Sequence, residues 1–192
     1  MLRTLYDRTL ALAGHRHALW FLAAIAFVES SVFPIPPDVL IIPMVLARPR
    51  RAWLIAAVAT LSSVAGALLG YYIGWGLFES VGRPVLDFYH KAEDFDAFAL
   101  RYNEWGAWAV LVAGVTPFPF KVITIASGAT GLSLPVFVLA SLVARGLRFF
   151  LVAGLLRVIG APAKAFIEER LGLVFTIFCV CLFGGFALVR YM

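Results

Sequence analysis

Apolar stretches of uneven length run along most of the chain, and two of the breaks between them are alike. The motif Pro-x-Pro occurs in residues 33–38 and again 83 residues later, in residues 116–121. In both copies a charged residue lies two residues past the second proline of the motif. Proline lacks a backbone donor and disfavours helical geometry in the residue before it, so a helix cannot run through either break. The sequence therefore predicts that one helical arm ends and another begins at five prolines: Pro34, Pro36, Pro37, Pro117 and Pro119.

The arms on either side of each break are short. Residues 18–33 precede the first break and Val39–Ala47 follow it. About nine residues reach only roughly 14 Å as a helix, whereas a bilayer core is about 30 Å thick. Trp105–Val115 and Val122–Leu132 flank the second break in the same way. Each pair of arms is therefore predicted to form a re-entrant helical hairpin, which enters and leaves the membrane on one side.

Longer apolar stretches follow each hairpin. Ala52–Phe78 carries no charge over 27 residues, and Leu134–Leu156 is also long enough to span a bilayer. A last uncharged stretch, Leu171–Val189, predicts a C-terminal transmembrane helix at about 171–190. Within the first span, three glycines at four-residue spacing predict a face on which another helix can approach closely. They are Gly66, Gly70 and Gly74.

The polar segments between these stretches are predicted to lie at the membrane surface. Residues 79–104 hold six acids and three bases, with aromatic residues at helix-like intervals, which favours an amphipathic surface helix. Residues 2–17 alternate apolar and charged positions and favour a short interfacial helix. Residues 157–170 mix bases and acids and are also expected at the interface.

The order of hairpin and spanning helix occurs twice, which predicts an internal repeat. Repeat one covers about 18–78 and repeat two about 105–158, within a single domain of residues 1–192. Because each repeat contains one true span, the second must enter the membrane from the opposite side. The predicted fold is thus an all-α polytopic membrane protein built on an inverted repeat.

Composition agrees with a membrane protein. The chain is 62% hydrophobic and 14% charged, with a mean hydropathy of +0.94, whereas soluble domains are about half apolar and a quarter charged. The net charge of +5 is spread between apolar segments rather than gathered on one face, which argues against nucleic-acid binding. Basic residues are expected on the cytoplasmic side. This rule places the N-terminus inside, with nine bases there (Arg3, Arg8, Arg16, Arg48, Arg50, Arg51, Arg157, Lys164 and Arg170) against four outside (Arg83, Lys91, Arg101 and Arg190).

No pattern in the sequence indicates an enzyme, a cofactor or a metal site. Cys179 and Cys181 lie two residues apart in an apolar helix and so face different sides, and no Cys/His ligand cluster occurs elsewhere. The Gly-x-Ser-x-Gly and His-Glu-x-x-His motifs are absent.

Five ionisable residues lie in sequence predicted to be at membrane depth: Glu29, Asp38, Lys121, Arg145 and Arg148. A charge at mid-bilayer costs at least about 2–3 kcal/mol on insertion scales, so each needs a partner or a wet cavity. In one interpretation the five only pair with one another and hold the hairpins together. In a second, Asp38 and Lys121 extend to the membrane surface, or Asp38 simply caps a helix.

The functional interpretation places these residues around a shared polar cavity between opposed hairpin tips. Arg145 and Arg148 are three residues apart on one helix face, and arginine suits bidentate contact with phosphate. Lys121 adds a point charge, and helices that restart after Pro37 and Pro119 would aim amide groups at an anion. Glu29 and Asp38 could balance charge or carry protons.

The sequence resembles the DedA superfamily, also called the VTT or SNARE-associated domain, and is most similar to its YqaA-type bacterial branch. Four stretches carry the resemblance, over roughly residues 18–158: Glu29–Asp38, Gly66–Gly74, Thr116–Gly128 and Ala144–Phe149. Many members carry an arginine before the second proline and another shortly after it, where this chain has Thr116 and Lys121. The resemblance implies opposed re-entrant hairpins, with acidic residues at Glu29 and Asp38 and basic ones at Lys121, Arg145 and Arg148.

The resemblance also implies movement of phospholipids or of a polyprenyl-phosphate carrier across the bacterial inner membrane, coupled to protons in some members. The expected partners are thus membrane lipids with anionic phosphate headgroups. Two alternatives stay open at this point: a proton-coupled carrier of small ions or drugs, and a non-transporting membrane scaffold or assembly factor. The sequence leaves the oligomeric state open.

Overall fold

The structure is a computed structural model that describes residues 17–32, 36–90, 92–116, 119–160 and 162. The elements within these ranges are all helical: α2 (Ala18–Ser31), α3 (Asp38–Ala47), η1 (Pro49–Arg51), α4 (Ala52–Leu77), η2 (Phe78–Gly82), α5 (Arg83–Phe88), α6 (Ala92–Val115), α7 (Phe120–Ala129) and α8 (Leu134–Ile159). Several predicted features lie wholly or mostly outside the described residues: the N-terminal helix 2–17, segment 157–170, the C-terminal helix 171–190, Cys179, Cys181, Pro34 and Pro117.

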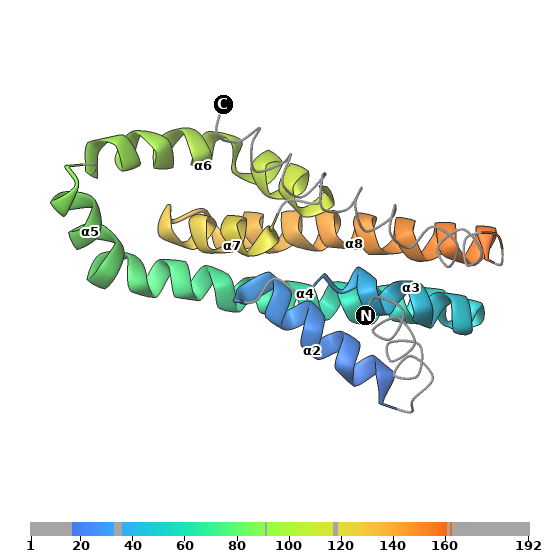
Figure 1. The fold of residues 1–192 in the computed structure, drawn as a ribbon. Coiled ribbons are helices and arrows are strands. Elements are labelled where there is room, and N and C mark those ends of the chain that lie inside the picture. Colours follow the sequence, from blue (N-terminus) through green and yellow to red (C-terminus); the bar gives the residue numbers. More distant parts are fainter. Residues whose placement is uncertain (1–16, 33–35, 91, 117–118, 161, 163–192) are drawn as a thin grey trace.

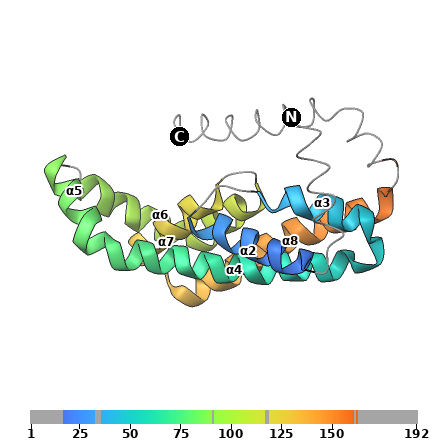
Figure 2. The same ribbon diagram turned by 60° about the horizontal axis from the view of Figure 1, so that its bottom comes forward.

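Two long helices, α4 and α8, form the axis of the molecule. They lie side by side, and their chain directions are opposite (Figure 1). α2 crosses α4, α7 packs against α4, and α6 packs against α8. Seen from a second direction, α4 and α8 again run along the length of the molecule, and α5 lies at one end of it (Figure 2).

Two helical stretches are long and apolar enough to cross a membrane: Pro49–Phe88, which includes α4, and Leu134–Ile159, which is α8. Many of their large apolar side chains point outward rather than into the protein. On α8, Leu139, Val143, Leu151 and Leu155 are each more than half exposed. Their spacing of four and eight residues places them on one face, where they would contact lipid rather than water. The chain is thus all-helical in the part described, with two candidate membrane spans.

Both proline-rich segments separate helices, as the sequence predicts. α2 ends at Ser31 and α3 begins at Asp38, while α6 ends at Val115 and α7 begins at Phe120. Pro37 and Pro119 stand immediately before the helices that restart. A proline is tolerated there because the first backbone N–H groups of a helix have no partner within that helix.

The helix before the second break differs from the prediction. The sequence places a surface helix over 79–104 and a separate arm from Trp105, but α6 runs without interruption from Ala92 to Val115. Its buried residues explain the continuity, because Tyr102, Gly106 and Val110 are four residues apart and form one inward face across the predicted boundary. The polar part of the segment is instead divided among η2, α5 and the first turns of α6.

The three glycines of α4 lie where neighbouring helices cross it. A Cβ on Gly66 would overlap the backbone of Phe27 in α2, and one on Gly74 would overlap the backbone of Ile125 in α7. Gly70 lies between these crossings, against the side chain of Thr124. The glycine face thus lets α2 and α7 approach the same side of α4, which brings the two segments beside the proline breaks close together.

Two clusters of buried apolar side chains flank this contact. One joins α2, α3, α4 and α8 through Leu22, Ile41, Ile55 and Phe149, among others. The other joins α4, α6, α7 and α8 through Tyr71, Val110, Phe120 and Phe137, among others. Arg145 lies between the two clusters, against Phe149 of the first and Phe120 of the second.

Candidate functional site

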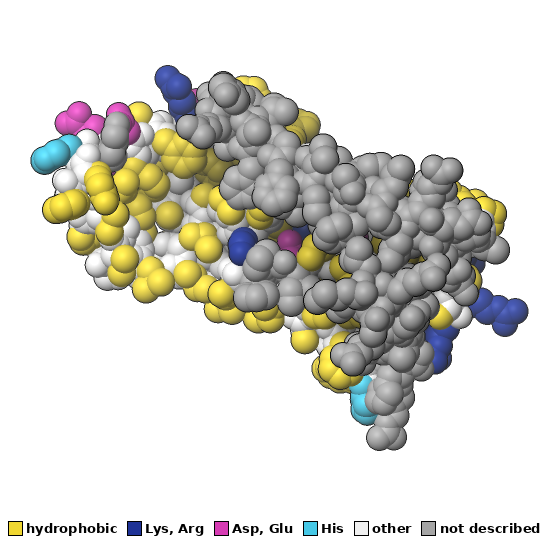
Figure 3. Space-filling view, in the orientation of Figure 1, with side chains coloured by type: hydrophobic (Ala, Val, Ile, Leu, Met, Phe, Trp, Pro, Cys, Tyr) yellow, Lys and Arg dark blue, Asp and Glu magenta, His cyan; other side chains and the backbone are white. Residues whose placement is uncertain are grey.

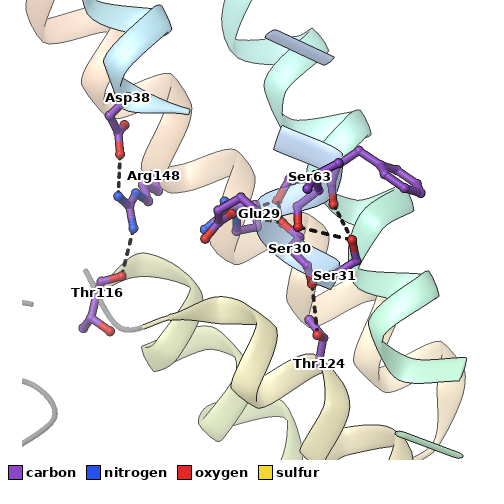
Figure 4. Close-up of polar contacts among 11 residues, drawn as sticks. Glu29, Ser30, Ser31, Asp38, Ser63, Thr116, Thr124 and Arg148 are labelled. Atoms are coloured by element: carbon purple, nitrogen blue, oxygen red, sulfur yellow. Dashed lines mark hydrogen bonds and ion pairs between the residues drawn. The ribbon is translucent and has the colours of Figure 1, made fainter. Parts of the chain in front are cut away.

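Arg148 on α8 connects the two proline breaks. Its Nη2 donates to Asp38 Oδ2 at 2.6 Å, where α3 begins, and its Nη1 donates to the Thr116 carbonyl oxygen at 2.9 Å, just after α6 ends (Figure 4). The side chains of Arg148 and Asp38 are each 17% exposed. One guanidinium group therefore holds both breaks, and part of it can still be reached from outside.

Arg145, one turn earlier on α8, is directed into the protein instead. Its Nη2 donates to Glu29 Oε2 at 2.5 Å and its Nε donates to Ser63 Oγ at 2.7 Å. The guanidinium lies over the rings of Phe120 and Phe149, with its Cζ 4.9 and 4.6 Å from the ring centroids. The side chain is only 1% exposed. Hydrogen bonds, an ion pair and two aromatic faces together replace the water that this charge has lost.

Small hydroxyl side chains join α2, α4 and α7 around this pair. Ser30 Oγ lies 2.6 Å from Ser63 Oγ, and Ser30 Oγ also donates to Glu29 Oε2 at 3.2 Å. Thr124 Oγ1 on α7 lies 3.0 Å from the Ser30 carbonyl oxygen, to which it donates (Figure 4). These bonds link the last turn of α2 to the helix that follows the second break.

Lys121 lies at the same contact without a carboxylate partner. Its Nζ donates to the Val32 carbonyl oxygen at 3.2 Å, directly beside the first break. Within the described part of the chain it forms no ion pair. Because Arg145 and Arg148 are paired with Glu29 and Asp38, three bases and two acids leave the cluster with one net positive charge.

Asp38 retains an unused acceptor. Its Oδ1 is buried and accepts no hydrogen bond from any described residue. The space-filling view shows basic and acidic side chains beside each other near the middle of one face, between hydrophobic side chains (Figure 3). Of the two ion pairs in the cluster, Arg148–Asp38 is the one whose side chains are both partly exposed, whereas the Arg145 side chain is enclosed.

The five ionisable residues singled out in the sequence thus lie together, on four helices that come from both halves of the chain. The residues that sequence reasoning did not single out are Ser30, Ser63, Thr124 and the aromatic rings of Phe120 and Phe149. Serine and threonine occur throughout the apolar helices, so no local pattern identified these members. The nearest signal was that Ser30 directly follows Glu29.

A cavity of about 550 Å³ lies elsewhere, at the end of α4. Its lining comes from the last turn of α4, from η2, from the first turns of α6 and from the turn after α7, and it includes the ion pair Arg83–Asp96. None of the five ionisable residues of the charged cluster lines it. Across the described residues, no group of three or more His, Cys, Asp or Glu side chains is arranged to hold a metal ion.

Comparisons with known proteins connect this arrangement to a family. Residues 35–158 match the VTT domain. A protein of Haemophilus influenzae is 37% identical over 152 residues, and a protein of Histophilus somni is 33% identical over 152 residues. Each alignment covers 79% of this chain and 79% of the relative, and both relatives are described as uncharacterized. No solved structure gives a significant match.

Proposed function

The chain belongs to the VTT-domain family, also called the DedA family, of membrane proteins, and on that premise we propose that it moves a phosphate-bearing lipid between the leaflets of a bilayer. The lipid would be a phospholipid or a polyprenyl-phosphate carrier. Its headgroup would pass the charged cluster while its acyl chains stay in the hydrocarbon. The protein would act as a transporter and not as an enzyme.

The observation that carries this proposal is the position of Arg148. The same guanidinium binds Asp38 and the Thr116 carbonyl, one from each break, and it is partly exposed. Arginine binds phosphate bidentately through the same donors that it uses for a carboxylate. A lipid phosphate could therefore replace Asp38 on Arg148, and this exchange would also loosen the link between the two breaks.

Lys121 would favour this exchange. It supplies the surplus positive charge at the contact between the breaks, and within the described chain it has only a carbonyl oxygen as partner. Arg145 would have a different role, because its charge is enclosed and bound to Glu29. We assign Arg145 and Glu29 to holding the shape of the site, and Arg148 and Lys121 to contact with the phosphate. A released Asp38 carboxylate could take up a proton, which would permit coupling to a proton gradient.

The arrangement of the helices supports an inverted repeat as the basis of transport. A helix, a break, a short helix and a long helix follow one another in both halves, although the first of these helices is longer in the second half, where it is α6. The long helices α4 and α8 run in opposite directions. We propose that each pair of short arms is a re-entrant hairpin, one from each leaflet. We further place the protein in the bacterial inner membrane with its N-terminus in the cytoplasm, on the distribution of Lys and Arg in the sequence.

Reconstitution into liposomes tests the proposal. Purified full-length protein is compared with protein-free vesicles for the transfer of labelled phospholipids between leaflets, across several headgroups. We expect the wild type to raise the transfer rate above that of protein-free vesicles. In Arg148→Ala this increase should be at least about tenfold smaller, because an Arg–phosphate contact contributes on the order of 1.5–3 kcal/mol. Arg148→Lys should retain part of the rate, since it keeps the charge but cannot contact both breaks with one planar group.

Arg83→Ala is the matched control, because it also removes one arginine but lies in the separate cavity at the end of α4. It should transport like the wild type. Thermal unfolding in detergent shows whether each variant is folded. Wild-type transfer no faster than in empty vesicles, over all lipid classes, would refute lipid transport. Flux of a soluble ion or drug without lipid transfer would favour a small-molecule carrier instead.

A further inference from the structure

Arginine side chains gather at the end of the molecule opposite the cavity. Arg50 and Arg51 lie on η1, between α3 and α4, and Arg157 lies in the last turn of α8. η1 and α8 are in contact, so the three arginines belong to one surface region. Basic side chains project from this end of the molecule, at the right of the space-filling view (Figure 3).

Arg157 is held in place by an aromatic stack. Its Cζ lies 5.5 Å from the centroid of the Trp53 ring, and the Trp53 ring stacks on Phe150 with centroids 5.9 Å apart and planes at 16°. A Cβ on Gly154 would lie 3.1 Å from the Trp53 ring, so the indole rests directly on the backbone of α8. Trp53 itself is 46% exposed. The region therefore combines a fixed guanidinium, two further arginines and an accessible aromatic face.

The charge of this region is not balanced by its described surroundings. Arg50, Arg51 and Arg157 are exposed and form no ion pair within the described residues. The neighbouring stretches 39–78 and 119–160 contain no Asp or Glu. One candidate span begins here, at Pro49, and the other ends here, at Ile159. If both cross a bilayer, the arginines and Trp53 lie where hydrocarbon meets the headgroups.

We propose that Arg50, Arg51, Arg157 and Trp53 form a binding site for the headgroup of an anionic phospholipid. The arginines would contact the phosphate, whose negative charge is not balanced by a cationic headgroup in an anionic phospholipid, and the indole of Trp53 would lie against the glycerol and ester groups. This site is separate from the charged cluster at the breaks, so it does not depend on transport. A retained lipid here would fix the first turn of α4 against the last turn of α8.

The site predicts selective and saturable lipid binding. Purified full-length protein in a neutral detergent is titrated with phosphatidylglycerol or with phosphatidylcholine, and bound lipids are counted by native mass spectrometry. We expect the wild type to retain at least one phosphatidylglycerol at concentrations where it retains no phosphatidylcholine. Each arginine changed to glutamine should weaken this binding about fivefold. The triple change Arg50→Gln, Arg51→Gln and Arg157→Gln should weaken it about a hundredfold.

Arg101→Gln is the charge-matched control for each single change in the site, because it removes one exposed arginine on α6, outside the site. The control should leave retention unchanged, and thermal unfolding should show that every variant is folded. An equal loss in the control would mean diffuse charge attraction and would overturn the proposal. Equal retention of phosphatidylcholine, or displacement of the lipid by equimolar glycerol phosphate, would overturn it as well.

Discussion

Arg145 is a charged side chain with almost no access to solvent. Its ion pair with Glu29 determines how much stability the protein loses when Arg145 is replaced. The Arg145 side chain is 1% exposed and that of Glu29 is 13% exposed. Loss of one partner leaves the other buried and unpaired, which costs about 3–5 kcal/mol. We therefore expect Arg145→Met to lower the free energy of unfolding by about this amount, as measured by denaturant unfolding in detergent micelles.

The double variant Glu29→Gln, Arg145→Met distinguishes pairing from packing. It removes both charges and leaves the volumes similar, so it should be more stable than Arg145→Met alone. If the double variant were less stable than Arg145→Met alone, the buried Glu29 carboxylate would not need Arg145 as its partner. The hydrogen bond from Arg145 Nε to Ser63 is lost in both variants and cancels in the comparison.

The two arginines of α8 show how far residue-level prediction reached. Their spacing of three residues indicated one helix face and a shared role. In the structure they do lie beside one cluster, but Arg145 binds Glu29 in the interior and Arg148 binds Asp38 and Thr116 near the surface. The aromatic rings of Phe120 and Phe149 make this difference. Phe149 lies four residues after Arg145 on α8, so helix spacing alone places its ring. Phe120 begins α7, and its position depends on how α7 packs against α4 and α6, which spacing along α8 does not specify.

At the scale of elements, the glycine face of α4 sets how closely α2 and α7 approach. A Cβ on Gly74 would overlap the Ile125 backbone, and a backbone cannot move aside as a flexible side chain can. We expect Gly74→Ala to lower the free energy of unfolding by about 1–3 kcal/mol, the usual cost of overpacking. Thermal or denaturant unfolding in micelles measures the change.

Gly76 provides the control within the same helix. A Cβ there would meet no atom within 4 Å, and the position is helical, so Gly76→Ala should be neutral or stabilise by up to about 1 kcal/mol. Similar losses at both positions would mean that helix propensity, and not the crossing with α7, controls stability. The four-residue glycine spacing predicted a packing face from sequence, but it did not indicate which helices pack there.

The element boundaries follow from sequence wherever proline or charge marks them. The start of α8 at Leu134 and the range of α4 agree closely with the apolar stretches, and both proline-rich segments separate helices. The predicted arm starts at Trp105, several turns after the observed start of α6 at Ala92, because hydropathy rises at Trp105 while the buried face formed by Tyr102 and Gly106 crosses that boundary. A change in average polarity therefore does not end a helix whose inward positions stay apolar or small.

For the whole molecule, the opposite directions of α4 and α8 lead to a prediction about sidedness. Ala47 lies at the end of α3 beside η1, and Val158 lies near the end of α8, which contacts η1. Ser80 and Ser133 lie at the opposite end of the molecule, each within two residues of the lining of the cavity beside the last turn of α4. If α4 and α8 each span the bilayer, these two pairs of positions must lie on opposite sides of the membrane.

Single cysteines at these four positions, in a background with Cys179→Ser and Cys181→Ser, test this in intact cells with a thiol reagent that does not cross membranes. We expect Ser80→Cys and Ser133→Cys to be labelled from outside, and Ala47→Cys and Val158→Cys to be labelled only after the membrane is opened. The expected side follows from the excess of Lys and Arg near Ala47. If Ser80 and Ala47 were labelled from the same side, α4 would not span, and the two breaks could not approach from opposite leaflets. Transport through the contact between the breaks requires that opposed approach, because a headgroup must reach Arg148 from either leaflet in turn.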